Sequence, residues 1–114
     1  MVLMHALLSE CKTGVPAIVE ALAREEGLPP RQLASAIVQG RVSVPANPRR
    51  ASKVCAIGAG CRVKVNVNIG TSMQTCDPLL ERRKGEAAIA NGADTLMDLS
   101  TAGDIPSLRR EILQ

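Results

Sequence analysis

From residue 62 onward the sequence predicts a strand, a helix, a second strand and a second helix, and this order constrains the fold more than any other feature. The first strand covers residues 62–70, where valine or isoleucine alternates with polar residues, as in a strand with one apolar face. The second strand covers residues 95–99. Two strands joined by a helix pair in parallel through a right-handed crossover. The sequence therefore predicts a parallel α/β arrangement in this half of the chain.

The helix between the two strands has recognisable end signals. Asp77 is a favoured N-cap residue, Pro78 suits the first helical position, and Asn91 followed by glycine is typical of a helix end. We expect the helix over residues 78–91 to carry its charged side chains, Glu81 among them, toward solvent.

Each predicted strand runs into a loop rich in glycine, serine and threonine, at residues 70–72 and 100–103. Polar groups collect at strand ends in catalytic barrels, and backbone N–H groups in such loops can bind a phosphate. An ordinary turn is the more frequent explanation of either loop taken alone. After the second loop, Ser107 is expected to cap a last helix in which Leu108 and Ile112 share one face.

The first half of the chain is predicted to be mainly helical. Apolar spacing predicts one helix within residues 14–27 and a second within residues 29–40, each ended by glycine. Residues 1–12 indicate either a short helix or an irregular lead-in. Val42 and Val44 alternate with polar neighbours as in a short strand, and residues 56–60 are typical of a turn.

The composition excludes several classes of protein. The chain has 114 residues, fewer than the roughly 200 that a closed eight-stranded barrel needs. It contains no Phe, Tyr or Trp on which bases could stack, and its net charge of +3 is mild, so we expect no nucleic-acid partner. It has no apolar run near the about 18 residues of a membrane span, and its start lacks the basic, apolar pattern of a signal peptide, so we expect no leader segment. We therefore expect no membrane partner and a cytoplasmic location.

Residues that bind metals or act in catalysis are few and scattered. His5 is the only histidine, and the four cysteines show no C-x-x-C spacing, so we predict no metal site and no catalytic residue in this chain. Asp98 fits two interpretations, orientation of a substrate hydroxyl or a structural hydrogen bond. Met97 lies within a predicted strand, where methionine is more often part of a core than a ligand contact.

Three segments resemble phosphomethylpyrimidine synthases. KVNVNIGTS at residues 64–72 and GADTLMDLSTAGDI at residues 92–105 look like the first two strand–loop units of that family. GRVSVPAN at residues 40–47 looks like the stretch that leads into its barrel. The chain departs from the family pattern at Val67 and Ala102, where smaller residues are usual, and both changes are mild.

The resemblance implies an incomplete α/β fold. Residues 1–60 would form a helical N-terminal region with a linking segment, and residues 61–114 would form the first two βα units of a (β/α)8 TIM barrel. The chain would then be the N-terminal portion of such an enzyme. Its open strand edges are expected to pair with the remainder of the barrel or with another copy of the chain.

The same resemblance implies an activity and a substrate. The family converts 5-aminoimidazole ribotide to hydroxymethylpyrimidine phosphate in thiamine biosynthesis, as a homodimeric radical lyase that uses S-adenosylmethionine, a 4Fe–4S cluster and zinc. Asn68 and Met97 match two of its ribotide contacts, an amide that can donate and accept and a pliable apolar wall. The family's cluster and zinc ligands are missing from the sequence. We therefore expect this chain alone to be inactive and to carry none of those cofactors.

Two alternatives stay open at this point. A hydroxybenzimidazole synthase acts on the same ribotide and shares these strands. A non-catalytic remnant would keep the strands and only self-associate. Sequence beyond residue 114 would separate the three, because an enzyme needs a cysteine motif for its cluster.

Overall fold

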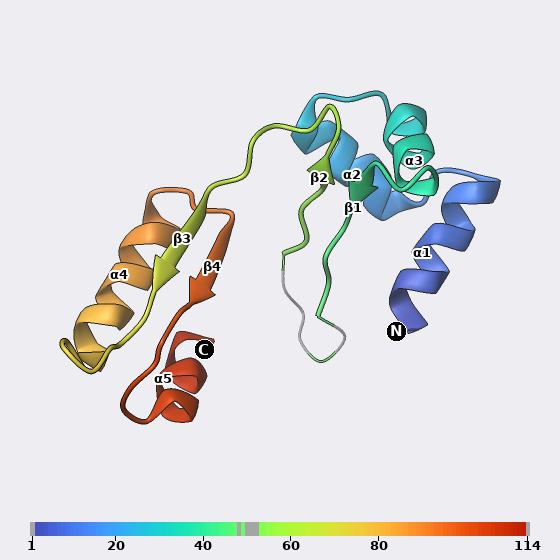
Figure 1. Ribbon diagram of the computed structural model, residues 1–114. Helices are drawn as coiled ribbons and strands as arrows, with labels where there is room; N and C mark the ends of the chain where they lie inside the picture. Colours follow the sequence, from blue (N-terminus) through green and yellow to red (C-terminus); the bar gives the residue numbers. More distant parts are fainter. Residues whose placement is uncertain (1, 48, 50–52, 114) are drawn as a thin grey trace. The chain divides into compact units, whose positions relative to one another are not determined.

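The computed structural model describes residues 2–47, 49 and 53–113. The chain divides into two compact units, Met1–Val63 and Lys64–Gln114. Each unit has its own strands and helices (Figure 1). Within the described residues, no helix is long and apolar enough to span a membrane.

The first unit contains three helices, α1 (Val2–Thr13), α2 (Ala17–Glu26) and α3 (Pro30–Val38). The open question about the start of the chain is answered by α1, which is a regular helix. The predicted C-terminal end of α2 is confirmed, since Gly27 follows it with φ of 67°, a left-handed conformation that glycine adopts without strain, whereas the helix starts at Ala17 and not at Gly14. Proline also opens α3 as predicted.

The core of the first unit lies between α1, α2, α3 and a small hairpin. Val19 and Leu33 are its largest fully buried side chains, and aliphatic residues together with Cys11 form the described core because the chain has no aromatic residues. Strands β1 (Val42–Ser43) and β2 (Ile57–Gly58) pair antiparallel beside it. The predicted turn at residues 56–60 is therefore partly a strand, and the predicted strand near Val42 is present but shorter.

The second unit follows the predicted order, with β3 (Asn66–Ile69), α4 (Pro78–Ala90), β4 (Thr95–Asp98) and α5 (Ile105–Ile112). The two strands pair in parallel, which confirms the prediction. Their arrows in Figure 1 run in the same direction, and α4 makes the return connection between them. The described residues form two separate two-stranded sheets and no closed barrel.

The sheet formed by β3 and β4 has one covered face and one exposed face. Ile69 is buried, and the added Cβ of an alanine at Gly85 would lie 3.7 Å from the Leu96 side chain, so α4 covers this face. Arg109 of α5 binds Asp98 on the same face. The exposed face carries the side chains of Asn66, Asn68, Thr95 and Met97.

The prediction of a strand over residues 62–70 is wrong in its first half. The side chain of Val63 is 88% exposed, and regular pairing begins only at Asn66, opposite Thr95. The partner strand sets this limit, because the residue before it, Asp94, uses its carboxylate to accept the Val65 N–H at 2.8 Å. An alternating sequence predicts a strand only where a neighbouring strand is present to pair with it.

The predicted cap of the last helix is also wrong. Asp104, and not Ser107, is the N-cap of α5, and its carboxylate accepts the Ser107 backbone N–H at 3.0 Å. The Ser107 hydroxyl donates to the same carboxylate at 2.8 Å. The helix therefore begins at Ile105, two residues before the serine, as expected when an aspartate cap is followed by proline in the first turn.

Candidate functional site: the exposed face and the loops at its end

The parallel register brings the two predicted site residues together. Asn68 of β3 lies directly opposite Met97 of β4, and both are exposed on the same face. Neighbouring strands are about 4.8 Å apart, so an amide and a thioether stand side by side. Met97 is 49% exposed, so in the described part of the chain it does not act as a core residue.

The other pair on this face is polar. Asn66 lies opposite Thr95, and the Thr95 hydroxyl donates to Asn66 Oδ1 at 2.7 Å. Asn66 Nδ2 donates in turn to Asn68 Oδ1 at 3.1 Å. The two asparagines of β3 thus have partners within the sheet, which reduces the cost of placing amides on one strand face.

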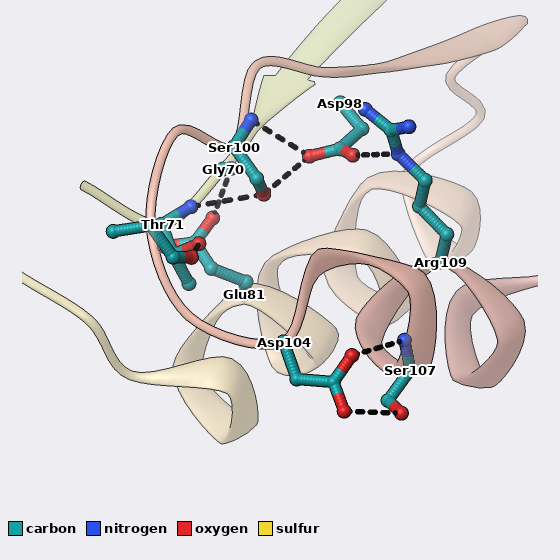
Figure 2. Close-up of polar contacts among 9 residues, drawn as sticks. Gly70, Thr71, Glu81, Asp98, Ser100, Asp104, Ser107 and Arg109 are labelled. Carbon is teal, nitrogen blue, oxygen red and sulfur yellow. Dashed lines mark hydrogen bonds and ion pairs between the residues drawn. The ribbon is translucent and has the colours of Figure 1, made fainter.

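The loops that follow β3 and β4 are bound to each other, as Figure 2 shows. The Thr71 N–H donates to the Ser100 hydroxyl oxygen at 3.1 Å, and the Thr71 hydroxyl donates to the Ala102 carbonyl at 2.5 Å. The Thr101 N–H donates back to the Thr71 carbonyl at 2.8 Å. Thr71 is only 2% exposed, so it is a buried link between the two strand ends.

These contacts distinguish the two interpretations of the loops, ordinary turns and phosphate donors. The Gly70 N–H donates to Glu81, the Thr71 N–H to Ser100, and the Ser100 N–H to the Asp98 carboxylate. Their N–H groups are engaged within the protein. The loops therefore act as turns that join the strands, and the phosphate interpretation is wrong for these groups.

Glu81 is a buried carboxylate that the sequence analysis placed on the solvent side of α4, and this prediction is wrong. Glu81 is 3% exposed, accepts the Gly70 N–H at 2.6 Å and pairs with Lys84 at 2.7 Å. Burial raises the pKa of Glu81, but hydrogen bonds from Lys84 and from the Gly70 N–H outweigh burial, and the pKa lies below its ordinary value. The sequence feature that points to this burial is the position of Glu81 in the first turn of α4, after the loop that follows β3.

Asp98 makes structural hydrogen bonds, the second of the two interpretations left open by the sequence. Its carboxylate accepts from the Ser100 hydroxyl at 2.5 Å and from Arg109 Nε at 2.5 Å (Figure 2). Burial raises the pKa of Asp98, but the hydrogen bonds from Ser100 and Arg109 outweigh burial and hold the pKa below its ordinary value. Asp98 therefore fixes the end of β4 and points away from the face that carries Met97.

The described residues do not fit a metal ion or an iron–sulfur cluster. Among them, no three His, Cys, Asp or Glu side chains gather closely enough to hold a metal. Asp94, Asp98 and Asp104 bind a strand N–H, an arginine and a helix N-terminus respectively, so they form no shared acidic site. The side chain of His5 lies outside the described residues.

The second unit therefore belongs to the parallel α/β class, with a polar strand face and two loops bound together at its end. The model of the radical SAM ThiC family matches residues 6–114. Phosphomethylpyrimidine synthase of Methanopyrus kandleri is 49% identical over 110 residues, 95% of this chain and 26% of that protein. The chain belongs to this family, as its sequence resemblance indicated.

Other relatives carry two different names. Phosphomethylpyrimidine synthase 1 of Methanosarcina barkeri is 41% identical over 83% of this chain and 22% of its own length. 5-Hydroxybenzimidazole synthase of Geobacter sulfurreducens is 45% identical over 82% of this chain and 21% of its own length. The chain thus spans about a quarter of the length of these relatives and matches their N-terminal part.

Replacing Gly70 with alanine is expected to separate the two loops. The new Cβ would lie 2.7 Å from the Leu99 carbonyl carbon and the Ser100 nitrogen, and Gly70 has φ of 155°. We expect a loss of about 1–3 kcal/mol in the free energy of unfolding of the second unit, measured by amide hydrogen exchange of β3 and β4. Gly92→Ala is the matched control, because Gly92 has φ of 81° but open space around it. Equal losses in both variants would contradict a close approach at Gly70.

Acid is expected to destabilise the second unit through Glu81 and Asp98. Both carboxyl groups have a lowered pKa in the folded state, against about 4.3 and 3.9 in the unfolded chain. Their stabilising contribution is therefore complete above these unfolded values and is lost as the pH falls through the folded ones. Urea unfolding followed by circular dichroism from pH 6 to pH 2 should show this loss.

Two variants test whether Glu81 causes the loss of stability in acid. Glu81→Gln should flatten the pH dependence, because a neutral amide does not pair with Lys84 as a carboxylate does. Glu86→Gln should leave it nearly unchanged, because Glu86 forms an exposed ion pair with Arg82. An unaltered pH dependence in Glu81→Gln would contradict the role given to the buried carboxylate.

Proposed function

We propose that this chain supplies part of the ribotide-binding site of a phosphomethylpyrimidine synthase, a radical S-adenosylmethionine lyase of thiamine biosynthesis. The ligand is 5-aminoimidazole ribotide, and the product of the whole enzyme is hydroxymethylpyrimidine phosphate. The observation that carries the proposal is the parallel register, which sets Asn68 opposite Met97 on one exposed face. The names of relatives such as that of Methanopyrus kandleri support the choice of pathway.

Asn68 and Met97 have complementary tasks in this proposal. The Asn68 carboxamide forms a hydrogen bond with a polar atom of the ribotide. The Met97 thioether supplies a flexible apolar surface beside the imidazole ring. The bound loops at residues 70–72 and 100–103 hold the ends of both strands, and so keep the two side chains at a fixed spacing.

In this proposal β3, α4, β4 and α5 are the first two βα units of a (β/α)8 barrel. The exposed face of Asn68 and Met97 is then the inner face, and α4 and α5 belong to the outer layer. The remainder of the barrel, or another copy of the chain, covers the open strand edges. The 4Fe–4S cluster and zinc are held by other parts of the enzyme, because the described residues gather no three His, Cys, Asp or Glu side chains that could hold a metal. S-adenosylmethionine binds there with the cluster. The chain alone is therefore inactive.

A 5-hydroxybenzimidazole synthase is the second candidate. The 45% identity to the enzyme of Geobacter sulfurreducens lies between the 49% and 41% identities to two phosphomethylpyrimidine synthases, so identity alone does not separate the two candidates. Both candidates use the same ribotide, so the site proposed for Asn68 and Met97 serves either one. Analysis of the reaction product by mass spectrometry separates a pyrimidine phosphate from a benzimidazole.

Asn68→Ala is expected to weaken ribotide binding by about 1–3 kcal/mol, because it leaves a polar group of the ligand without a partner. Isothermal titration calorimetry of the complete barrel with 5-aminoimidazole ribotide measures this loss. Asn91→Ala is the matched control, since Asn91 caps the far end of α4 and its amide binds the Ala87 carbonyl. Unchanged affinity in Asn68→Ala, or an equal loss in the control, would contradict the proposed contact.

A further inference from the structure

Three polar side chains on the exposed face form a directed series of hydrogen bonds. The Thr95 hydroxyl donates to Asn66 Oδ1 at 2.7 Å, and Asn66 Nδ2 donates to Asn68 Oδ1 at 3.1 Å. The series begins on β4, crosses to β3 and ends at the residue proposed to contact the ribotide.

The register of the sheet determines which residues can take part. Asn66 and Thr95 are direct partners across the two strands, and Asn66 and Asn68 are two positions apart on one strand, so all three share one face. A shift by one residue would move Asn66 and Asn68 to the covered face. The series thus depends on the same pairing that sets Asn68 opposite Met97.

The direction of the series determines which atoms Asn68 presents. A carboxamide has its acceptor oxygen on one side and its donor NH2 group on the other. Because Asn68 Oδ1 accepts from Asn66, that oxygen faces Asn66 and the Nδ2 group is directed away from it. The NH2 group is then the part of the Asn68 carboxamide that can meet a ligand on this face.

We propose that Thr95 and Asn66 are positioning residues that orient the Asn68 carboxamide so that Asn68 donates to the ligand. This inference rests on the proposed function and deepens it. Asn68 then selects an acceptor, such as an unprotonated ring nitrogen or a ribose or phosphate oxygen, and disfavours a group that can only donate. Neither Thr95 nor Asn66 has to touch the ligand.

Thr95→Val tests the first step of the series, because valine keeps the β-branched shape and removes the hydroxyl donor. In spectra of the 114-residue chain without ligand, we expect shifted side-chain NH2 signals for Asn66 and Asn68 and faster exchange of their protons. Thr95→Ser should restore the wild-type signals. Thr75→Val, in the turn after β3, is the matched control and should leave both signals in place. Unchanged Asn66 and Asn68 signals in Thr95→Val would overturn the inference.

Asn66→Asp tests the direction of the series. A carboxylate at this position only accepts, so it still accepts from Thr95 but draws the NH2 group of Asn68 toward itself. In the proposed direction this variant turns the Asn68 carboxamide over and shifts its NH2 signals strongly. If the series ran in the opposite direction, Asn68 would already donate to Asn66, and Asn66→Asp would leave the orientation of the Asn68 carboxamide unchanged. Retention of the wild-type Asn68 orientation would therefore overturn the inference.

Ribotide affinity provides the second readout. In the complete barrel, Thr95→Val should raise the Kd for 5-aminoimidazole ribotide about fivefold, as expected for one weakened hydrogen bond, and Thr95→Ser should restore it. Wild-type affinity in Thr95→Val would overturn the positioning role. If the wild-type barrel fails to bind the ribotide, the proposed function fails, while the ligand-free spectra still decide how Asn68 is oriented.

Discussion

The parallel pairing of β3 with β4 is the interaction on which the rest of the second unit depends. Because side chains alternate between the two faces of a strand, one register decides at once which residues are covered and which are exposed. The observed register covers Ile69 and exposes Asn68 opposite Met97. It is held at the start by the Asp94 carboxylate on the Val65 N–H, and at the end by the contact of Thr71 with Ser100.

Burying polar groups at the strand ends is unfavourable unless every group has a partner. Among the described residues of this unit, Thr71 and Glu81 are the buried polar ones; Thr71 donates to the loop after β4, and Glu81 accepts from the loop after β3. In the described part of the chain, no buried side-chain nitrogen or oxygen is left without a partner. The loops after β3 and β4 are therefore fixed by specific hydrogen bonds, and these bonds hold the carboxyl ends of the two strands together.

Much of this arrangement follows from local sequence signals. Asp77 and Pro78 predict the start of α4, because helix caps depend on neighbouring residues. Two strands joined by that helix predict parallel pairing, because the hand of such a crossover follows from the chirality of the chain. Asn68 and Met97 were identified by family resemblance, since period two only assigns Asn68 to the polar face of its strand. Their role as ligand contacts stays a prediction.

Other features depend on contacts between distant segments, and the sequence did not predict them. A glutamate in a charged helix normally faces solvent, and Glu81 is buried only because the Gly70 N–H lies in front of it. The alternating pattern continues N-terminally to Val63, but β4 begins only at Thr95, so Val63 lies outside the sheet and is exposed. Asp104 and Ser107 are both favoured cap residues, and Asp104 caps the helix because proline occupies the first turn directly after it.

The most direct test of this account is the register of β3 and β4 in solution. Nuclear Overhauser contacts between backbone protons of the chain report which residues lie opposite each other. The account predicts parallel contacts that pair Asn68 with Met97 and Asn66 with Thr95. An antiparallel pattern, or a register shifted by one residue, would remove Asn68 from the side of Met97 and would contradict it.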